Sequence, residues 1–196
     1  MPTDARILRF KFEYLRNFVM ANNTFKDLVQ KRRSSRKFTD EELTPEDLQL
    51  ILRAGLMSPT GKSVRGWHFI VVDDKDTLIK LSQCKDAGAA FVAEVPVAVV
   101  VLYDTSLSDV WIEDASIASV TMQYQAADLG IGSCWAQVRL RGLSDGTPSD
   151  EILRELLQYP HNMSALSIIA FGYPAIERKM QDEDKLKWEN VHVNKF

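Results

Sequence analysis

The spacing of apolar and polar residues along the chain predicts a mixed fold of helices and strands. A first helix is expected after Thr24, because Thr24 and Asp27 have the spacing of a capping box and an apolar face follows. A second helix is expected after Thr44, where Pro45 takes the first helical position and acidic residues fill the first turn. Each helix leads into a segment of polar and small residues.

The remaining apolar runs predict four strands and three further helices. Strands are expected at 67–73, 97–103, 133–138 and 167–171, and helices at 75–83, 111–129 and 149–157. The helix at 111–129 has small residues on its apolar face, which permits close packing, and Gly130 suits its C-terminal cap. The tail from Ala175 onward is charged.

Nothing in the sequence marks a boundary between two domains. The chain has 196 residues, of which 45% are hydrophobic, enough for one sizeable core. It shows no internal repeat, low-complexity stretch or linker. One domain is expected at residues 24–196. Residues 1–23 form an N-terminal extension of unknown role, within which Met20 is an alternative start.

The charge balance and the cysteines exclude several classes of protein. Lys and Arg number 24 and Asp and Glu number 27, so neither nucleic acid nor an anionic membrane surface is an expected partner. The two cysteines, Cys84 and Cys134, have no C-x-x-C spacing, as expected in a reducing cytosol. Charges interrupt the first nineteen residues, which excludes a signal peptide, and no apolar run reaches roughly 20 residues. We expect a soluble, cytoplasmic protein.

A basic heptad, Lys31 to Lys37, follows the first predicted helix. Guanidinium groups pair with phosphate oxygens in a bidentate manner, and serine hydroxyls or backbone N–H groups can complete such a site. The heptad is therefore a candidate phosphate site. Taken alone, the heptad is more typical of a solvated basic patch.

A second segment, residues 58–69, joins a predicted helix to a predicted strand through small and polar residues. Glycine in such a loop lets backbone amides approach a flat ligand. Gly61, Lys62 and Ser63 match the end of a P-loop, but Leu56 replaces the required upstream glycine. The order helix, loop, strand is also the reverse of the order in that motif, so nucleotide hydrolysis is disfavoured.

Metal and dinucleotide motifs are missing from the sequence. The three histidines, His68, His161 and His192, lie far apart without metal-ligand spacing, so no metal site is expected. No G-x-G-x-x-G string occurs, so a Rossmann dinucleotide site is not expected.

Residues 24–196 resemble the nitroreductase family, whose signature has Arg-Arg-Ser-x-Arg followed downstream by Ser-Pro-x-x-x-Asn-x-Gln-Pro-Trp. Residues 32–36 match the first block, and residues 58, 59 and 67 match the Ser, Pro and Trp of the second. Ser63, Arg65 and Gly66 stand where Asn, Gln and Pro are commoner. Two further stretches, 113–135 and 171–179, also fit.

The resemblance implies an α+β fold with a central, mostly antiparallel sheet flanked by helices, assembled as an intertwined homodimer with two FMN sites at the interface. The residues that would bind the FMN phosphate and ribityl chain are Arg32, Arg33, Ser34, Arg36, Arg178 and Lys179. Those that would come from the other subunit are Thr60, Gly61, Ser63 and Arg65. Trp135, Ala136 and Gln137 would pass the isoalloxazine ring, where a backbone N–H faces flavin N5 in the family.

The implied activity is that of an FMN-dependent oxidoreductase. Flavin N5 accepts a hydride from NADH or NADPH, and the same face then reduces a nitroaromatic compound, a quinone or a similar small-molecule acceptor, so ping-pong kinetics are expected. No catalytic side chain is required, because the flavin carries the chemistry, and Cys134 is expected to be a wall residue.

Several alternatives stay open at the level of the sequence. Dehalogenation, flavin fragmentation and azoline oxidation occur on the same fold. A flavin-binding module that stores the cofactor without turnover is a further possibility. The sequence does not distinguish NADH from NADPH, because neither a ribose-binding acid nor a 2′-phosphate-binding arginine can be identified.

Overall fold

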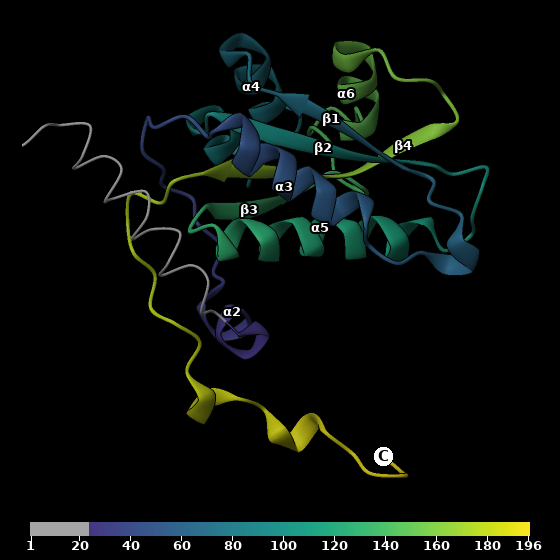
Figure 1. The fold of residues 1–196 in the computed structure, drawn as a ribbon. Helices are drawn as coiled ribbons and strands as arrows, with labels where there is room; N and C mark the ends of the chain where they lie inside the picture. Colours follow the sequence, from purple (N-terminus) through teal and green to yellow (C-terminus); the bar gives the residue numbers. More distant parts are fainter. Residues whose placement is uncertain (1–23) are drawn as a thin grey trace, which may run out of the picture.

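The computed structural model of the protein describes residues 24–196, and the predicted N-terminal extension, residues 1–23, lies outside the described residues. Figure 1 shows a single layer of sheet with helices packed on it. The α-helices are α2 (Phe25–Lys31), α3 (Pro45–Leu56), α4 (Lys75–Ser82), α5 (Trp111–Asp128) and α6 (Ser149–Leu157). Short 3-10 helices are η1 (Gly61–Ser63), η2 (Ala90–Glu94), η3 (Glu183–Lys185) and η4 (Trp188–Asn190).

The sheet has four antiparallel strands in the order β1-β2-β4-β3. They are β1 (Trp67–Val72), β2 (Val97–Asp104), β3 (Gly132–Gln137) and β4 (Met163–Gly172). The predicted α+β class with a mostly antiparallel sheet is therefore confirmed. Because β2 and β4 occupy the centre, β3 is an edge strand, and its outer edge is open to other parts of the chain.

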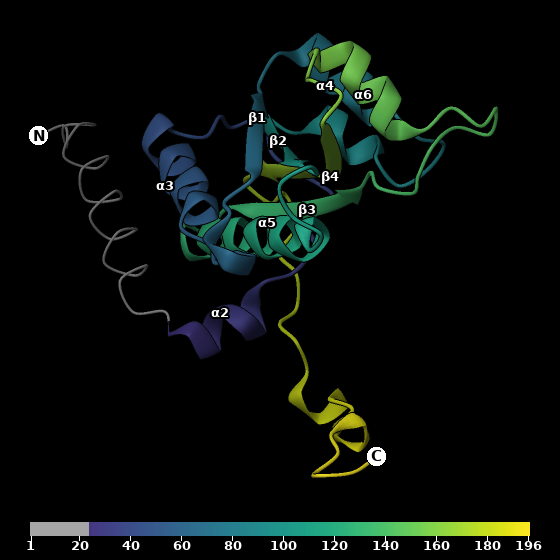
Figure 2. The same ribbon diagram turned by 90° about the vertical axis from the view of Figure 1, so that its right-hand side faces the viewer.

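Helices cover both faces of the sheet, with α3 and α5 on one face and α4 and α6 on the other (Figures 1 and 2). Residues 97, 99, 101 and 103 of β2 pack toward α3 and α5, whereas residues 98, 100 and 102 pack toward α4 and α6. The strand is buried along almost its whole length. Burial on both sides explains why its sequence is a continuous apolar run rather than an alternating one.

Helix α5 lies close to α3 because small residues line its packed face. Ala115, Ala118 and Ala126 are fully buried there. On the other side of the contact, a Cβ atom on Gly55 would lie 2.9 Å from Cγ of Met122, closer than such atoms pack. The absence of a side chain at Gly55 thus sets the spacing of the two helices.

The predicted helices are confirmed, and their ends follow local capping. The Asp27 N–H donates to the Thr24 hydroxyl at 3.3 Å, and the Thr24 N–H donates to the Asp27 carboxylate at 2.9 Å. The helix predicted at 111–129 ends at Asp128, and Gly130 follows the cap residue with a φ of 73°. Such a left-handed residue beyond the cap is the conformation that favours glycine.

The strand predicted at 167–171 is part of a longer strand, Met163–Gly172. Its first residues pair with the end of β2, where Met163 faces Asp104 and Ser164 faces Tyr103. The predicted strand was too short because this pairing is a tertiary contact. The first residues of the strand, Met163 to Leu166, include Ser164 and Ala165 and carry little local signal for it.

The C-terminal segment returns to the start of the described chain. Pro174 forms an antiparallel bridge with Phe38, and the Ala175 N–H donates to the Lys37 carbonyl at 3.0 Å. Further along, the Gln181 N–H donates to the Gln30 carbonyl at 2.9 Å. The segment then leaves the body as an arm, residues 182–196, as Figures 1 and 2 show.

None of the helices within residues 24–196 has the length and apolar character needed to cross a membrane.

Candidate functional site

The basic segment lies against the open edge of β3. Ser34 forms a parallel bridge with Ser133, and the Ser35 N–H donates to the Ser133 carbonyl at 3.0 Å. The contact is close because Gly132 has no side chain. A Cβ atom there would lie 2.9 Å from Oγ and 3.0 Å from Cβ of Ser35.

Four guanidinium groups gather at this place around a cavity of about 310 Å³. The residues that line it are Arg32, Arg33, Ser34, Arg36, Arg178 and Gln181. The lining contains no carboxylate. Among residues 24–196, no ion pair involves Arg32, Arg36 or Arg178. Four cations without a counter-charge form a site for an anion, and phosphate matches the guanidinium geometry.

Neighbouring groups hold two of these arginines in place. Arg33 donates to Oε1 of Gln181 at 3.0 Å, and Gln181 is itself fixed by its backbone bond to Gln30. The guanidinium of Arg36 lies 5.9 Å from the centre of the Phe91 ring, within the range of a cation–π contact. Neither Gln181 nor Phe91 was predicted, since no motif marks them.

A larger cavity of about 670 Å³ shares Arg32, Arg33 and Arg178 with the first. It extends under the end of α5 and along the C-terminal segment, where Lys179 is part of its lining. The structure thus brings five of the six residues predicted to bind phosphate around one cavity. Lys179 belongs to the adjoining one.

The outer edge of β3 presents unused backbone donors. The N–H and C=O groups of one residue in a strand point to the same side, and that side alternates along the strand. Because the Ser133 carbonyl points outward to Ser35, the N–H groups of Trp135 and Gln137 also point outward. No strand covers this edge beyond Ser133 in the described chain.

The side chains on β3 are locked around that edge. Nε1 of Trp135 donates to Oε1 of Gln137 at 2.9 Å, and Nε2 of Gln137 donates to the Arg139 carbonyl at 3.1 Å. The Ala136 side chain is buried in the core, so only its backbone is available. Ser133 and Gln137 are about 13 Å apart along the strand. A phosphate-bearing chain with an attached ring can span this distance.

Lys85 adds a positive charge at the far end of this edge. Its Nζ donates to the Gln137 carbonyl at 2.8 Å. Burial lowers the pKa of Lys85, and repulsion from Arg141 acts in the same direction. Sequence reasoning missed Lys85, because a single lysine after a helix is typical of a solvated residue.

Both cysteines are buried free thiols. Burial is the main cause that raises the pKa of Cys134, although the nearby Arg36 acts in the opposite direction. Burial likewise raises the pKa of Cys84. Both side chains therefore favour the unreactive thiol form, which suits the wall role expected of Cys134.

The residues predicted to come from a second subunit lie elsewhere in the chain. Thr60, Gly61, Ser63 and Arg65 form the loop before β1, and the Gly61 N–H donates to Asp114 in the first turn of α5 at 2.8 Å. The arginine cavities adjoin Ala127, near the other end of α5. At a rise of 1.5 Å per residue, Asp114 and Ala127 are about 20 Å apart. Within one chain, the two groups do not meet.

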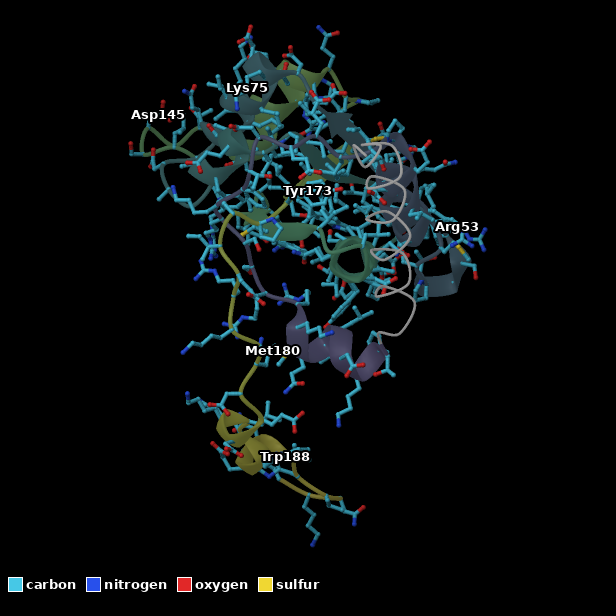
Figure 3. All side chains as sticks on the ribbon, turned by 60° about the vertical axis from the view of Figure 1, so that its left-hand side comes forward. Arg53, Lys75, Asp145, Tyr173, Met180 and Trp188 are labelled. Atoms are coloured by element: carbon cyan, nitrogen blue, oxygen red, sulfur yellow. The ribbon has the colours of Figure 1, made fainter. Side chains whose placement is uncertain are left out.

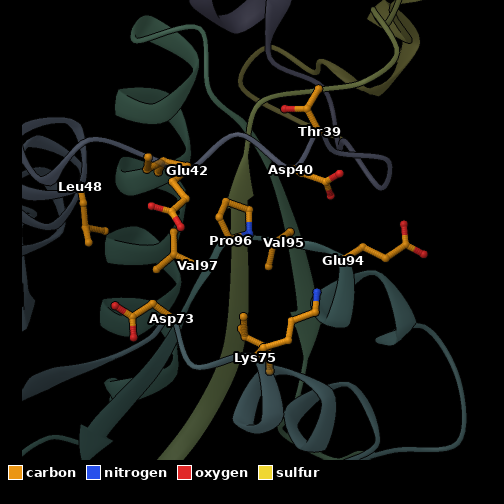
Figure 4. A pocket seen from close by; sticks show the side chains of 12 residues that line it. Thr39, Asp40, Glu42, Leu48, Asp73, Lys75, Glu94, Val95, Pro96 and Val97 are labelled. Carbon is orange, nitrogen blue, oxygen red and sulfur yellow. The ribbon is translucent and has the colours of Figure 1, made fainter.

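A third cavity, of about 380 Å³, has the opposite charge. Figure 4 shows Asp40, Glu42, Asp73 and Glu94 around it. Its one cation, Lys75, donates to the Ala93 carbonyl at 2.6 Å. A cavity with four carboxylates does not suit an anionic ligand, so an anion fits the arginine-lined cavity better. Across residues 24–196, no cluster of three or more His, Cys, Asp or Glu side chains is placed to hold a metal ion.

Comparisons with known proteins point to one family. The model of the nitroreductase family matches residues 29–84, which include the basic segment and the loop before β1. A protein of Archaeoglobus fulgidus assigned as an NADH dehydrogenase/NAD(P)H nitroreductase is 33% identical over 174 residues, covering 86% of this chain and 97% of its own. The FMN reductase [NAD(P)H] of Bacillus subtilis is 26% identical, covering 79% of this chain and 67% of its own.

A solved structure is similar over the same range. The FMN-dependent nitroreductase of Clostridium difficile R20291 aligns with a TM-score of 0.85 and 46% identity, covering 86% of this chain and 98% of that protein.

A side chain at Gly132 is expected to disturb the arginine cavity. In Gly132→Ala, the added methyl pushes Ser35 from β3, and overpacking of this kind costs about 1–3 kcal/mol of unfolding free energy. Urea denaturation measures that loss, and phosphate-induced stabilisation measures the anion site. Ser35→Gly removes the two nearest atoms that the methyl meets, although the Gly172 carbonyl oxygen at 3.2 Å remains, so the double variant should recover part of both. Equal losses in the single and double variants would contradict the steric explanation.

Proposed function

Because the chain belongs to the nitroreductase family, we propose that it reduces nitroaromatic compounds, quinones or similar acceptors by a ping-pong mechanism. The chain is an NAD(P)H-dependent FMN oxidoreductase. The observation that carries the site assignment is the cluster of four guanidinium groups, free of carboxylates, beside an edge strand with outward N–H donors.

The residues present fit FMN. Arg32, Arg36 and Arg178 would hold the phosphate, with Arg33 and Ser34 beside them, because these groups line one cavity whose lining has no carboxylate. Lys179 would add positive charge from the adjoining cavity. The edge formed by Trp135 to Gln137 would receive the ring, since its backbone N–H groups point outward and no strand covers them.

Bound FMN supplies a ring that takes a hydride from NAD(P)H at N5 and passes two electrons to an acceptor. The chain's own residues orient and stabilise it. The outward N–H groups at Trp135 and Gln137 would donate hydrogen bonds to the bound ring, and Lys85 would contribute a positive charge near Gln137. No described side chain is needed as an acid or base. The acceptor and the nicotinamide can therefore use the same open face of the flavin ring, one after the other.

We infer that the active form is a homodimer in which each site combines both subunits. The loop with Thr60, Gly61, Ser63 and Arg65 is about 20 Å from the arginine cluster along α5 within one chain. A second copy related by a twofold axis would supply that loop to the first. A cytoplasmic location stays a prediction from the sequence.

The surface of the single chain supports the same inference. The arm of residues 182–196 stands away from the body, and Figure 3 shows Trp188 far from the sheet. Trp188 is 70% exposed, and the other large apolar side chains of this arm are between 49% and 107% exposed. Exposed apolar residues also occur on α5, where Ile117 and Val120 face outward. Groups of this kind mark surfaces that a partner covers.

A visible spectrum tests the activity directly. The purified protein, reconstituted with FMN where necessary, is expected to absorb as an oxidised flavin and to bleach rapidly on anaerobic addition of NADH or NADPH. A storage module would stay oxidised. Initial-rate plots with an added quinone should give parallel lines, and converging lines would contradict the ping-pong mechanism. A colourless protein that cannot take up FMN would refute the whole assignment.

The phosphate assignment predicts selective losses of affinity. Arg36→Ala or Arg178→Ala should raise the Kd for FMN roughly ten- to hundredfold, because each removes charge-assisted bonds to phosphate. Riboflavin, which lacks the phosphate, should bind both variants as it binds the original chain. Fluorescence quenching gives both constants. Arg53→Ala, on the exposed side of α3 and outside the cavity, is the matched control. An equal loss for riboflavin would show that these arginines do not act on phosphate.

Removal of the arm is expected to weaken the dimer. A chain that ends at Gln181 keeps every arginine of the cavity and loses the exposed apolar residues of 182–196. Light scattering should show a shift toward monomer, and FMN affinity should fall with it. Lys187→Ala in the full chain is the control for a change of charge alone. A truncated chain that stays dimeric with unchanged FMN affinity would mean that the arm has no role in assembly.

A further inference from the structure

The loop before β1 has an unusual backbone. Three of its residues that are not glycine have left-handed φ angles, 52° at Lys62, 57° at Ser63 and 55° at Arg65. L-amino acids rarely adopt this conformation, because Cβ approaches the backbone. Such residues persist only where surrounding contacts hold them, and they tend to occur at functional sites.

A buried carboxylate provides those contacts at the start of the loop. Asp114 is only 2% exposed. Its Oδ1 accepts a hydrogen bond from the Gly61 N–H at 2.8 Å, and its Oδ2 accepts one from the Tyr103 hydroxyl at 2.8 Å. Both oxygens are thus used, one by the loop and one by the sheet. Burial is the main cause that raises the pKa of Tyr103, and the bond to Asp114 adds to it, so the hydroxyl remains a donor.

The loop also fits closely against its supports. A Cβ atom on Gly61 would lie 2.7 Å from Val110, and one on Gly66 would lie 2.6 Å from the Tyr103 ring. The Gly66 carbonyl accepts from the Asp104 N–H at 2.9 Å. Both ends of the loop are therefore fixed on α5 and β2. Between them, the side chains of Lys62, Ser63 and Arg65 are exposed.

We propose that Asp114 is a positioning residue for the flavin site of the partner subunit. Its carboxylate joins Gly61 of the loop to Tyr103 of the sheet and so holds Ser63 and Arg65 where a second copy's flavin needs them. The inference rests on the proposed function and on the shared site of the dimer. Asp114 itself touches neither cofactor nor substrate.

Two substitutions of one residue separate geometry from charge. Asp114→Ala removes both bonds and should raise the Kd for FMN about tenfold. Asp114→Asn keeps an oxygen that accepts from Gly61 and offers an amide that donates to the Tyr103 oxygen, so its Kd should stay within about threefold of the original. Equal Kd values for Asp114→Ala and the original chain, or an equally large loss in Asp114→Asn, would overturn the proposal.

A stability control distinguishes positioning from general damage. Leu153→Ala, in α6 on the other face of the sheet, should lower the melting temperature without changing the Kd for FMN. A loss of FMN affinity in this variant as large as in Asp114→Ala would show that destabilisation alone accounts for the effect.

Mixed dimers test the action across the interface. Asp114→Ala and Arg36→Ala chains, mixed by unfolding and refolding, should form heterodimers with one site of intact parts and one doubly defective site. Statistical mixing then restores high affinity to roughly a quarter of all sites. No recovery would mean that Asp114 acts within its own subunit, against the proposal.

Trypsin gives a readout that does not depend on flavin. Cleavage after Lys62 and Arg65 in the FMN-free protein should be about tenfold faster in Asp114→Ala than in the original chain or Asp114→Asn, because the loop is released. Unchanged cleavage would overturn the positioning role. Failure of the original chain to bind FMN would instead refute the proposed function, so the two failures are distinguishable.

Discussion

Helix α5 separates the loop before β1, which lies at its start, from the arginine cavities, which lie near its end. This separation decides whether one chain can bring the two together. Near its start, Asp114 holds the loop before β1, and near its end Ala127 adjoins the arginine cavities. The helix packs on the sheet through fully buried small residues. The distance between the two groups at its ends is therefore fixed. The loop before β1 and the larger arginine cavity of one chain are thus held about 20 Å apart. In the dimer we propose, a twofold axis pairs each half with its complement.

The arginines are brought together by backbone pairing between the C-terminal segment and the start of the described chain. The chain has a net charge of -3, yet the bridge between Phe38 and Pro174 brings Arg178 beside the basic segment. Like charges at close range repel, and in the described residues no carboxylate offsets them at this cavity. An anion that binds there removes the repulsion. If the cofactor phosphate binds there as we propose, its binding and the docking of the C-terminal segment should stabilise each other.

The two halves of the proposed site have a feature in common. In each, a glycine allows a loop to pack closely against the sheet or against the helix that covers it. Gly132 admits Ser35 to the edge of β3, and Gly66 admits the loop to the ring of Tyr103. Polar contacts then fix each loop, through the Ser133 carbonyl in one case and Asp114 in the other. The positions of the binding groups are therefore set by the rigid strands and helix rather than by the loops themselves.

Local signals in the sequence determined the elements and part of the site. Capping at Thr24 and Thr44, and the two-sided apolar run of β2, depend on neighbouring residues alone, so they could be predicted. The motif at residues 32–36 likewise identified the phosphate candidates. The resemblance to the family had already added Arg178 to these candidates. Only the tertiary structure decided that β4 begins at Met163, that Lys85 reaches the edge of β3, and that Asp114 is bonded to the loop before β1. These outcomes depend on long-range pairing and burial. A buried carboxylate in a first helical turn has the same local pattern as a solvated one, and only the fold separates the two.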